Sequence, residues 1–144
     1  GVRSHIEKQI RDRKLDNTIL LPHQPFETLN ESLNACDASL VTIAKGIEGI
    51  SFPSKLYSSL AVGKPILAIS ERYSSLKTII EKNNAGRWIE LGDPDGLVKA
   101  IRVMMNDSEE ATRMGKAARD LFNRDYTLQS SASKYADVLE KAMP

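Results

Sequence analysis

Residues 48–69, EGISFPSKLYSSLAVGKPILAI, place several ligand-binding groups around the start of one predicted helix. Glu48 supplies a carboxylate, the glycine after it opens a loop, and Lys55 follows in the first helical turn. Unpaired N–H groups and the positive end of a helix dipole attract phosphate oxygens. A lysine in a first turn opposes the dipole, so a nearby anion explains Lys55 better than fold stability does. The pattern indicates a site for a phosphorylated, hydroxyl-rich ligand.

The composition is that of an ordinary globular protein, with 144 residues, 41% hydrophobic and 27% charged, which predicts one domain over residues 1–144. Twenty basic and nineteen acidic residues give a net charge of +1 without a dense basic stripe, which excludes a nucleic-acid-binding surface. The apolar runs are too short to cross a bilayer, and one cysteine, Cys36, fits a reducing compartment. We therefore expect a cytoplasmic protein without a membrane segment of its own.

Hydrophobic periodicity alternates between strand and helix patterns along the chain. Strands are predicted at residues 18–21, 38–43, 65–69 and 86–91. Helices are predicted at residues 2–14, 27–35, 53–62, 74–83, 95–105, 108–122 and 128–142, with Ser108 as the cap of the helix 108–122. Parallel neighbouring strands need crossover helices, so this order predicts an α/β fold, a Rossmann-like parallel sheet with helices on both faces. The chain opens directly in a helical pattern, so we expect a fragment that lacks a first strand.

The predicted loop 44–52 lies where this architecture binds ligands. It follows a predicted core strand, and ligands of open parallel sheets bind outside the carboxyl ends of the strands. The position of the loop therefore supports the site that its residue types indicate.

Three motifs in this region carry a family resemblance. They are Glu48-Gly49, the run Pro53-Ser54-Lys55-Leu56-Tyr57, and Gly63-Lys64-Pro65. Together with the helical end of the chain, they resemble the donor-binding half of GT-B glycosyltransferases, specifically the large retaining group-4 family. The resemblance implies the C-terminal half of a two-domain enzyme, with an absent N-terminal acceptor domain as its partner. It also implies a nucleoside-diphosphate sugar such as a UDP-sugar as donor substrate, with no cofactor and no essential metal.

The resemblance also assigns roles to single residues. Glu48 matches the acidic residue that contacts the transferred sugar, and Lys55 matches the lysine that stabilises the diphosphate as the glycosidic bond breaks. The remaining substrate-binding residues that it implies are Gly49, Ile50, Ser51, Ser54, Ser58, Pro22 and His23. Many relatives carry a ribose-binding glutamate where this chain has Ser58, and a serine is the weaker partner, so the nucleotide preference stays open.

Other residues receive structural interpretations. The sequence Asp93-Pro94-Asp95 formally matches a metal-binding Asp-x-Asp motif, but it precedes a helical pattern and predicts a turn and a helix cap. His5 and His23 lack a second ligand at metal spacing, so we assign no metal. Gly63-Lys64-Pro65 is interpreted as a helix end followed by a strand start, with no ligand role for Lys64.

The intact protein is therefore expected to transfer a hexose or an acylated aminohexose to a hydroxyl acceptor with retention. The fragment alone should bind donor without turnover, because the acceptor half is absent. Two alternatives stay open: a nucleotide-sugar epimerase or phosphorylase-like enzyme on the same plan, and a non-catalytic doubly wound module used for docking. Any membrane attachment would reside in the absent half.

Overall fold

The structure is a computed structural model that describes residues 2–142. The chain forms two compact units, Gly1–Ser32 and Leu33–Pro144. The first contains α1 (Val2–Asp12), the short 3-10 helix η1 (Phe26–Thr28) and the beginning of α2 (Leu29–Asn34). None of the residues of α1 is buried.

The strand predicted at residues 18–21 is wrong, because this segment is irregular in the structure. An isolated extended segment leaves its backbone groups unpaired, and the described residues of the first unit contain no other strand to pair with it. The carbonyl of Leu21 instead accepts a hydrogen bond from the Arg3 guanidinium at 3.1 Å. The predicted helix 27–35 forms as η1 followed by α2.

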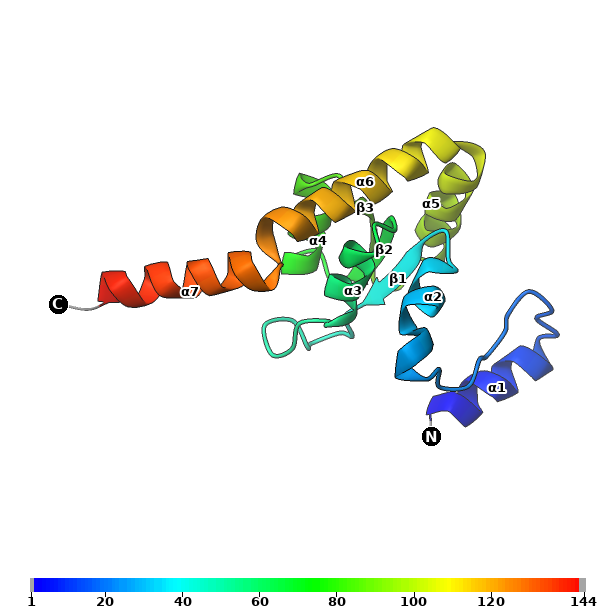
Figure 1. Cartoon of the computed structure of the whole chain (residues 1–144). Coiled ribbons are helices and arrows are strands. Elements are labelled where there is room, and N and C mark those ends of the chain that lie inside the picture. The colour runs from blue at the N-terminus through cyan, green and yellow to red at the C-terminus, as the bar shows by residue number, and fades with distance from the viewer. Residues whose placement is uncertain (1, 143–144) are drawn as a thin grey trace. The chain divides into compact units, whose positions relative to one another are not determined.

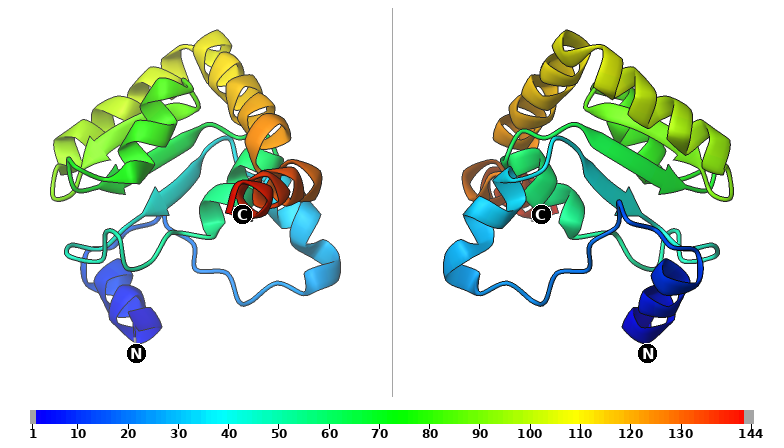
Figure 2. Two further views of the ribbon diagram at one scale, coloured as in Figure 1. Left: turned by 90° about the vertical axis from the view of Figure 1, so that its left-hand side faces the viewer. Right: turned by 90° about the vertical axis from the view of Figure 1, so that its right-hand side faces the viewer.

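A three-stranded parallel sheet organises the second unit (Figure 1). Its strands are β1 (Ser39–Thr42), β2 (Ile66–Ser70) and β3 (Gly86–Glu90), in the order β1-β2-β3. Ile69 of β2 lies opposite Thr42 on one side and Ile89 on the other. Two views of the ribbon show the strands running side by side in the same direction (Figure 2). The predicted Rossmann-like parallel sheet is confirmed.

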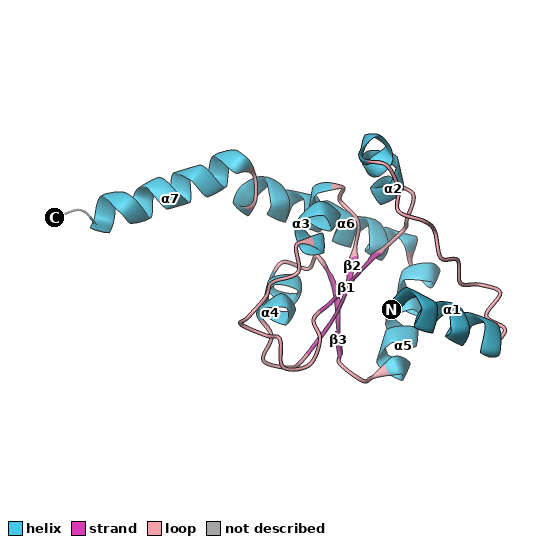
Figure 3. Cartoon of the chain, turned by 90° about the horizontal axis from the view of Figure 1, so that it is seen from below, coloured by secondary structure: helices cyan, strands magenta, loops and turns pink. Residues whose placement is uncertain are grey.

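Helices cover both faces of the sheet. They are α3 (Lys55–Ala61), α4 (Ser75–Lys82), α5 (Pro94–Asn106) and α6 (Ser108–Asp125). The last helix, α7 (Leu128–Ala142), packs against α6 and extends away from the sheet (Figure 1). Seen from below, α5 lies on the opposite side of the strands from α3 and α4 (Figure 3). The described helices of residues 2–142 include none with both the length and the apolar character needed to cross a bilayer.

The core fixes α3 and α4 against one face of β2. Leu56 and Leu60 of α3, Leu76 of α4 and Ile66 of β2 have no solvent exposure. Burial of one such side chain stabilises the fold by roughly 1.5–3 kcal/mol. These helices are therefore firmly held.

Helix caps agree with the sequence except at α6. The Asp93 carboxylate accepts the N–H of Gly96 at 2.9 Å ahead of α5, so the predicted turn and cap are confirmed. The predicted Ser108 cap of α6 is wrong, because Asp107 accepts the N–H of Glu110 at 2.8 Å. A carboxylate caps more favourably here because its charge also interacts with the helix dipole.

Gly115 lets α6 approach the turn that joins α3 to β2. Gly63 follows α3 with a φ of +66°, as expected for a glycine that ends a helix, and Pro65 leads into β2. A Cβ added at Gly115 would lie 2.5 Å from the carbonyl oxygen of Gly63. The contact between α6 and this turn therefore has no room for a side chain.

We expect Gly115→Ala to lower the free energy of unfolding by roughly 1–3 kcal/mol, because the added methyl group overpacks the contact with Gly63. Urea denaturation measures the change, with the exposed neighbour Lys116→Ala as control. A stabilised Gly115→Ala protein, as helix propensity alone would produce, contradicts the close contact.

Candidate functional site

The predicted site loop lies at the carboxyl edge of the sheet. Residues 43–54 connect the end of β1 to α3, and residues 71–74 connect the end of β2 to α4. Because the strands are parallel, both connections leave from the same edge. This is the edge at which open parallel sheets bind ligands.

Glu48 is fixed to the start of α4. Its Oε1 atom accepts hydrogen bonds from the backbone N–H of Ser75 at 2.9 Å and from the Ser75 hydroxyl at 2.8 Å. Its Oε2 atom is buried and accepts no hydrogen bond from the described residues. Buried polar atoms normally have partners, so this oxygen has the capacity to accept a hydrogen bond from a ligand hydroxyl.

The surroundings of Glu48 keep its carboxylate ionised. The Ser74 hydroxyl contributes most to a lowered pKa of Glu48, although it forms no hydrogen bond of ordinary geometry with the carboxylate, and the two Ser75 donors contribute further. Partial burial opposes this shift. Hydrogen bonds to a charged carboxylate favour its charged form, as does the adjacent helix start.

Lys55 lies in the first turn of α3, as predicted, although the helix begins at Lys55 itself and not at residue 53. Its side chain is exposed, and within the described part of the chain its ammonium group has no ion pair. The helix itself is held by the buried Leu56 and by Tyr57, whose ring lies 5.1 Å from that of Tyr126. The arrangement presents an unpaired cation on a rigid element at the carboxyl edge.

The loop amides are only partly available. Gly49 has a φ of +80°, and its N–H is unpaired with respect to residues 2–142. The N–H groups of Ile50 and Ser51 donate to the carbonyl of Ile47 at 3.0 and 3.2 Å. The tight turn after Ile47 therefore occupies two of the three amides that the resemblance implied as ligand donors. Their role requires the turn to open and stays a prediction.

The implied hydroxyl contacts lie on or beside α3. Ser54 precedes the helix, and its side chain makes no capping hydrogen bond. Ser58 lies one turn after Lys55 and donates its hydroxyl to the Lys55 carbonyl at 3.0 Å, so only its lone pairs remain for a ribose. Pro22 and His23 belong to the first unit, where both are exposed, and their place beside a nucleotide base stays a prediction.

Two residues that help to form this edge were not among those predicted from the sequence. Ser75 holds Glu48, and Glu71 accepts the N–H of Gly46 at 2.9 Å with its Oε2 atom. Glu71 follows β2 directly and Ser75 begins the next helix, so the rule that placed loop 44–52 at the carboxyl edge could also have pointed to them. Their partners, 27 and 25 residues away, could not be read from a local pattern.

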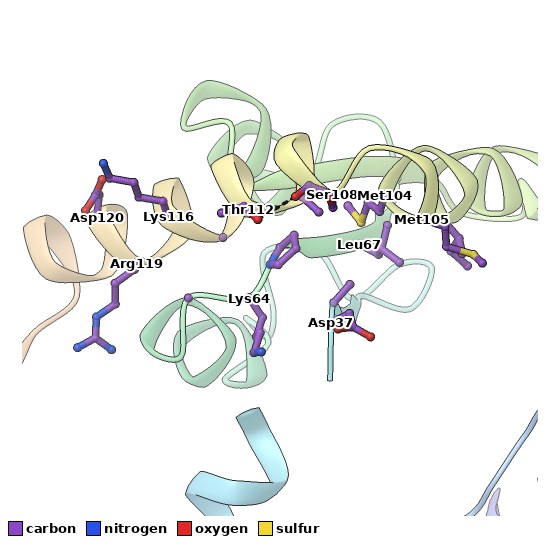
Figure 4. Close-up of a pocket in the computed structure, with 16 residues that line it drawn as sticks. Asp37, Lys64, Leu67, Met104, Met105, Ser108, Thr112, Lys116, Arg119 and Asp120 are labelled. Atoms are coloured by element: carbon purple, nitrogen blue, oxygen red, sulfur yellow. Dashed lines mark hydrogen bonds between the residues drawn. The ribbon is translucent and has the colours of Figure 1, made fainter. Parts of the chain in front are cut away.

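A large cavity of the second unit, about 920 Å³, lies at the other edge of the sheet (Figure 4). Asp37 precedes β1 and Lys64 precedes β2, so both mark the amino ends of the strands. Leu67, Met104 and Met105 give the cavity apolar walls. It contains none of the residues that the sequence assigns to the donor, and size alone does not make it the candidate site.

The carboxylate of Asp93 is engaged as a helix cap, and residues 2–142 bring together no group of three His, Cys, Asp or Glu side chains suited to a metal ion.

Comparison with known proteins decides the family. A family model described as "Glycosyl transferases group 1" matches residues 2–121. The chain belongs to this family.

Two curated proteins with similar sequences are also named as glycosyltransferases. The chain is 32% identical over 112 residues to "Probable glycosyltransferase WbjE" of Pseudomonas aeruginosa, a match that covers 78% of this chain and 28% of that protein. It is also 32% identical over 81 residues to "Putative colanic acid biosynthesis glycosyl transferase WcaI" of Escherichia coli K12, covering 56% of this chain and 20% of that protein. The chain thus spans less than a third of either relative.

Among solved structures, sucrose-phosphate synthase from Thermosynechococcus elongatus has the same fold. The match has a TM-score of 0.77 at 18% identity and covers 97% of this chain and 34% of that structure. The recognised glycosyltransferase family and the expected fold class are confirmed.

We expect Glu48→Gln to lower the free energy of unfolding at pH 7 and to lower it less at pH 3. The pKa of Glu48 is lowered in the folded protein, so its stabilising contribution is present above the ordinary value of 4.5 and is lost as the pH falls through the lowered pKa. Urea denaturation at both pH values measures this, with the exposed Glu140→Gln as control. An equal loss at both pH values contradicts a role for the charge.

Proposed function

We propose that this chain is the donor-binding domain of a retaining glycosyltransferase and that it binds a nucleoside-diphosphate sugar at the carboxyl edge of its sheet. The intact enzyme transfers the sugar to a hydroxyl acceptor without a metal ion. Membership of the glycosyltransferase family supports the reaction class. The donor, the stereochemistry and the acceptor class are part of the proposal.

One observation supports the proposed placement of the donor: Glu48 lies in the connection from β1 to α3, Lys55 begins α3, and the charged group of each lacks a partner within the described residues. Glu48 keeps a buried oxygen without a donor, suited to a sugar hydroxyl. Lys55 has an ammonium group without a partner in the described structure, suited to a diphosphate. A carboxylate for hydroxyls and a cation for phosphates are the two groups that a nucleotide sugar requires.

The proposed chemistry follows from the charges. As the bond between the sugar and the diphosphate breaks, negative charge grows on the diphosphate. A lysine held on a rigid helix stabilises that charge without reorganisation, which lowers the barrier. Glu48 holds the sugar in position for attack by the acceptor hydroxyl, and this positioning contributes further.

A second domain of the same protein is the proposed partner that completes the site. The chain spans 28% and 20% of its two curated relatives, so a protein of their kind is much longer. α7 carries side chains that this unit leaves exposed, among them Leu128 (89%), Tyr135 (75%) and Leu139 (63%). An apolar face of this kind fits a further domain.

Calorimetric titration with UDP, GDP and ADP tests the nucleotide site. We expect at least one to bind in the micromolar to millimolar range, and Lys55→Ala to weaken that binding by roughly 10- to 100-fold, the loss typical of a hydrogen bond to a charged group. Lys64→Ala is the matched control, because Lys64 precedes β2 at the opposite edge of the sheet.

The outcomes separate two claims. Failure of all three nucleotides to bind the wild-type chain contradicts the proposed function. Binding that Lys55→Ala leaves unchanged contradicts the role of Lys55 alone.

A further inference from the structure

Two carboxylates tie together the connections that follow β1 and β2. Glu71, the first residue after β2, accepts the N–H of Gly46 at 2.9 Å and the hydroxyl of Tyr73 at 2.7 Å, both on Oε2. In the opposite direction, Glu48 accepts the two Ser75 donors. Each connection thus supplies one acceptor to the other.

The middle of the loop from β1, residues 46–50, depends on these contacts because apolar burial does little for it. Ile47 and Ile50 are 41% and 79% exposed. Gly46 and Gly49 lie on either side of Glu48 with φ values of +76° and +80°. Glycine adopts positive and negative φ values about equally readily, so the backbone at these two positions has no strong conformational preference of its own. A segment with two such glycines and exposed isoleucines needs polar restraints to hold one conformation.

We propose that Glu71 is a positioning residue for Glu48: by fixing the N–H of Gly46, it holds the turn that presents the Glu48 carboxylate to the sugar of the donor. This inference rests on the proposed function. Glu71 does not touch the ligand itself, and Tyr73 donates a second hydrogen bond that orients its carboxylate.

The direction in which the Glu48 pKa changes when Glu71 is replaced tests this role. Hydrogen bonds from Gly46 and Tyr73 lower the pKa of Glu71, and the positive charge of Lys45 lowers it further. The negative charge of Glu48 acts in the opposite direction and raises the Glu71 pKa. The repulsion is mutual, so removal of the Glu71 charge by itself lowers the pKa of Glu48. Displacement of Glu48 from the Ser75 donors raises that pKa instead.

The first experiment is an NMR titration of the Glu48 carboxyl group, which needs no ligand. In Glu71→Ala, the loop loses its restraint, and we expect the pKa of Glu48 to rise toward 4.5. In Glu71→Gln, an oxygen remains to accept the N–H of Gly46, and we expect no rise. Glu90→Ala is the control, because Glu90 ends β3 at the same edge and pairs with Arg72 at 2.7 Å.

The second experiment compares affinities for UDP with UDP-glucose, GDP with GDP-mannose, and ADP with ADP-glucose. We expect Glu71→Ala to weaken binding of the sugar nucleotide by roughly tenfold, as for a lost polar contact, with less than about a twofold change for the matching diphosphate. Glu71→Gln should restore most of the affinity. The diphosphate is unaffected because Lys55 stands on α3, which Leu56 and Leu60 anchor independently.

The results separate this inference from the proposed function. An unchanged or lowered Glu48 pKa in Glu71→Ala, or equal losses for diphosphate and sugar nucleotide, overturns the positioning role. Absence of binding to every probe in the wild-type chain overturns the proposed function, and the positioning role with it. Should Glu71→Ala fail to fold, Glu71→Asp keeps the charge but shortens the reach to Gly46, and the same rise in the Glu48 pKa is required.

Discussion

Parallel pairing of β2 with a neighbour on each side is the constraint from which the site follows. It brings the connections after β1 and β2 to one edge of the sheet, where hydrogen bonds join residues that are 25 and 27 positions apart in the sequence. The strand is buried along most of its length, so its direction and register are strongly determined. The meeting of the two connections is therefore a consequence of the core.

The two edges of this sheet differ in what holds them. At the amino edge, α6 packs so closely on the turn at Gly63 that Gly115 has no room for a side chain, and apolar residues line a large cavity. At the carboxyl edge, hydrogen bonds from Ser75 to Glu48 and from Gly46 to Glu71 hold the two connections together. Polar restraints suit a binding edge because hydrogen bonds fix the direction of the side chains that they hold.

Agreement between sequence and structure was best where a pattern was local. The strands after residue 38, the helices between them and the cap at Asp93 were predicted close to their positions, because periodicity and capping act over a few residues. The strand at residues 18–21 failed because an apolar run forms a strand only beside a partner. The observed cap of α6, Asp107, lies one residue before the predicted one, a difference within the usual uncertainty of helix ends.

The sequence by itself determined the fold class, the family resemblance, and the placement of Glu48 and Lys55 around one helix start. Only the tertiary structure decided what those groups contact: Ser75 for Glu48, no partner in the described residues for Lys55, and the Ile47 carbonyl for the amides of Ile50 and Ser51. The reason is physical. Residue type and spacing set which backbone conformation is favoured locally, whereas a hydrogen bond between distant segments exists only after strand pairing has brought their ends together.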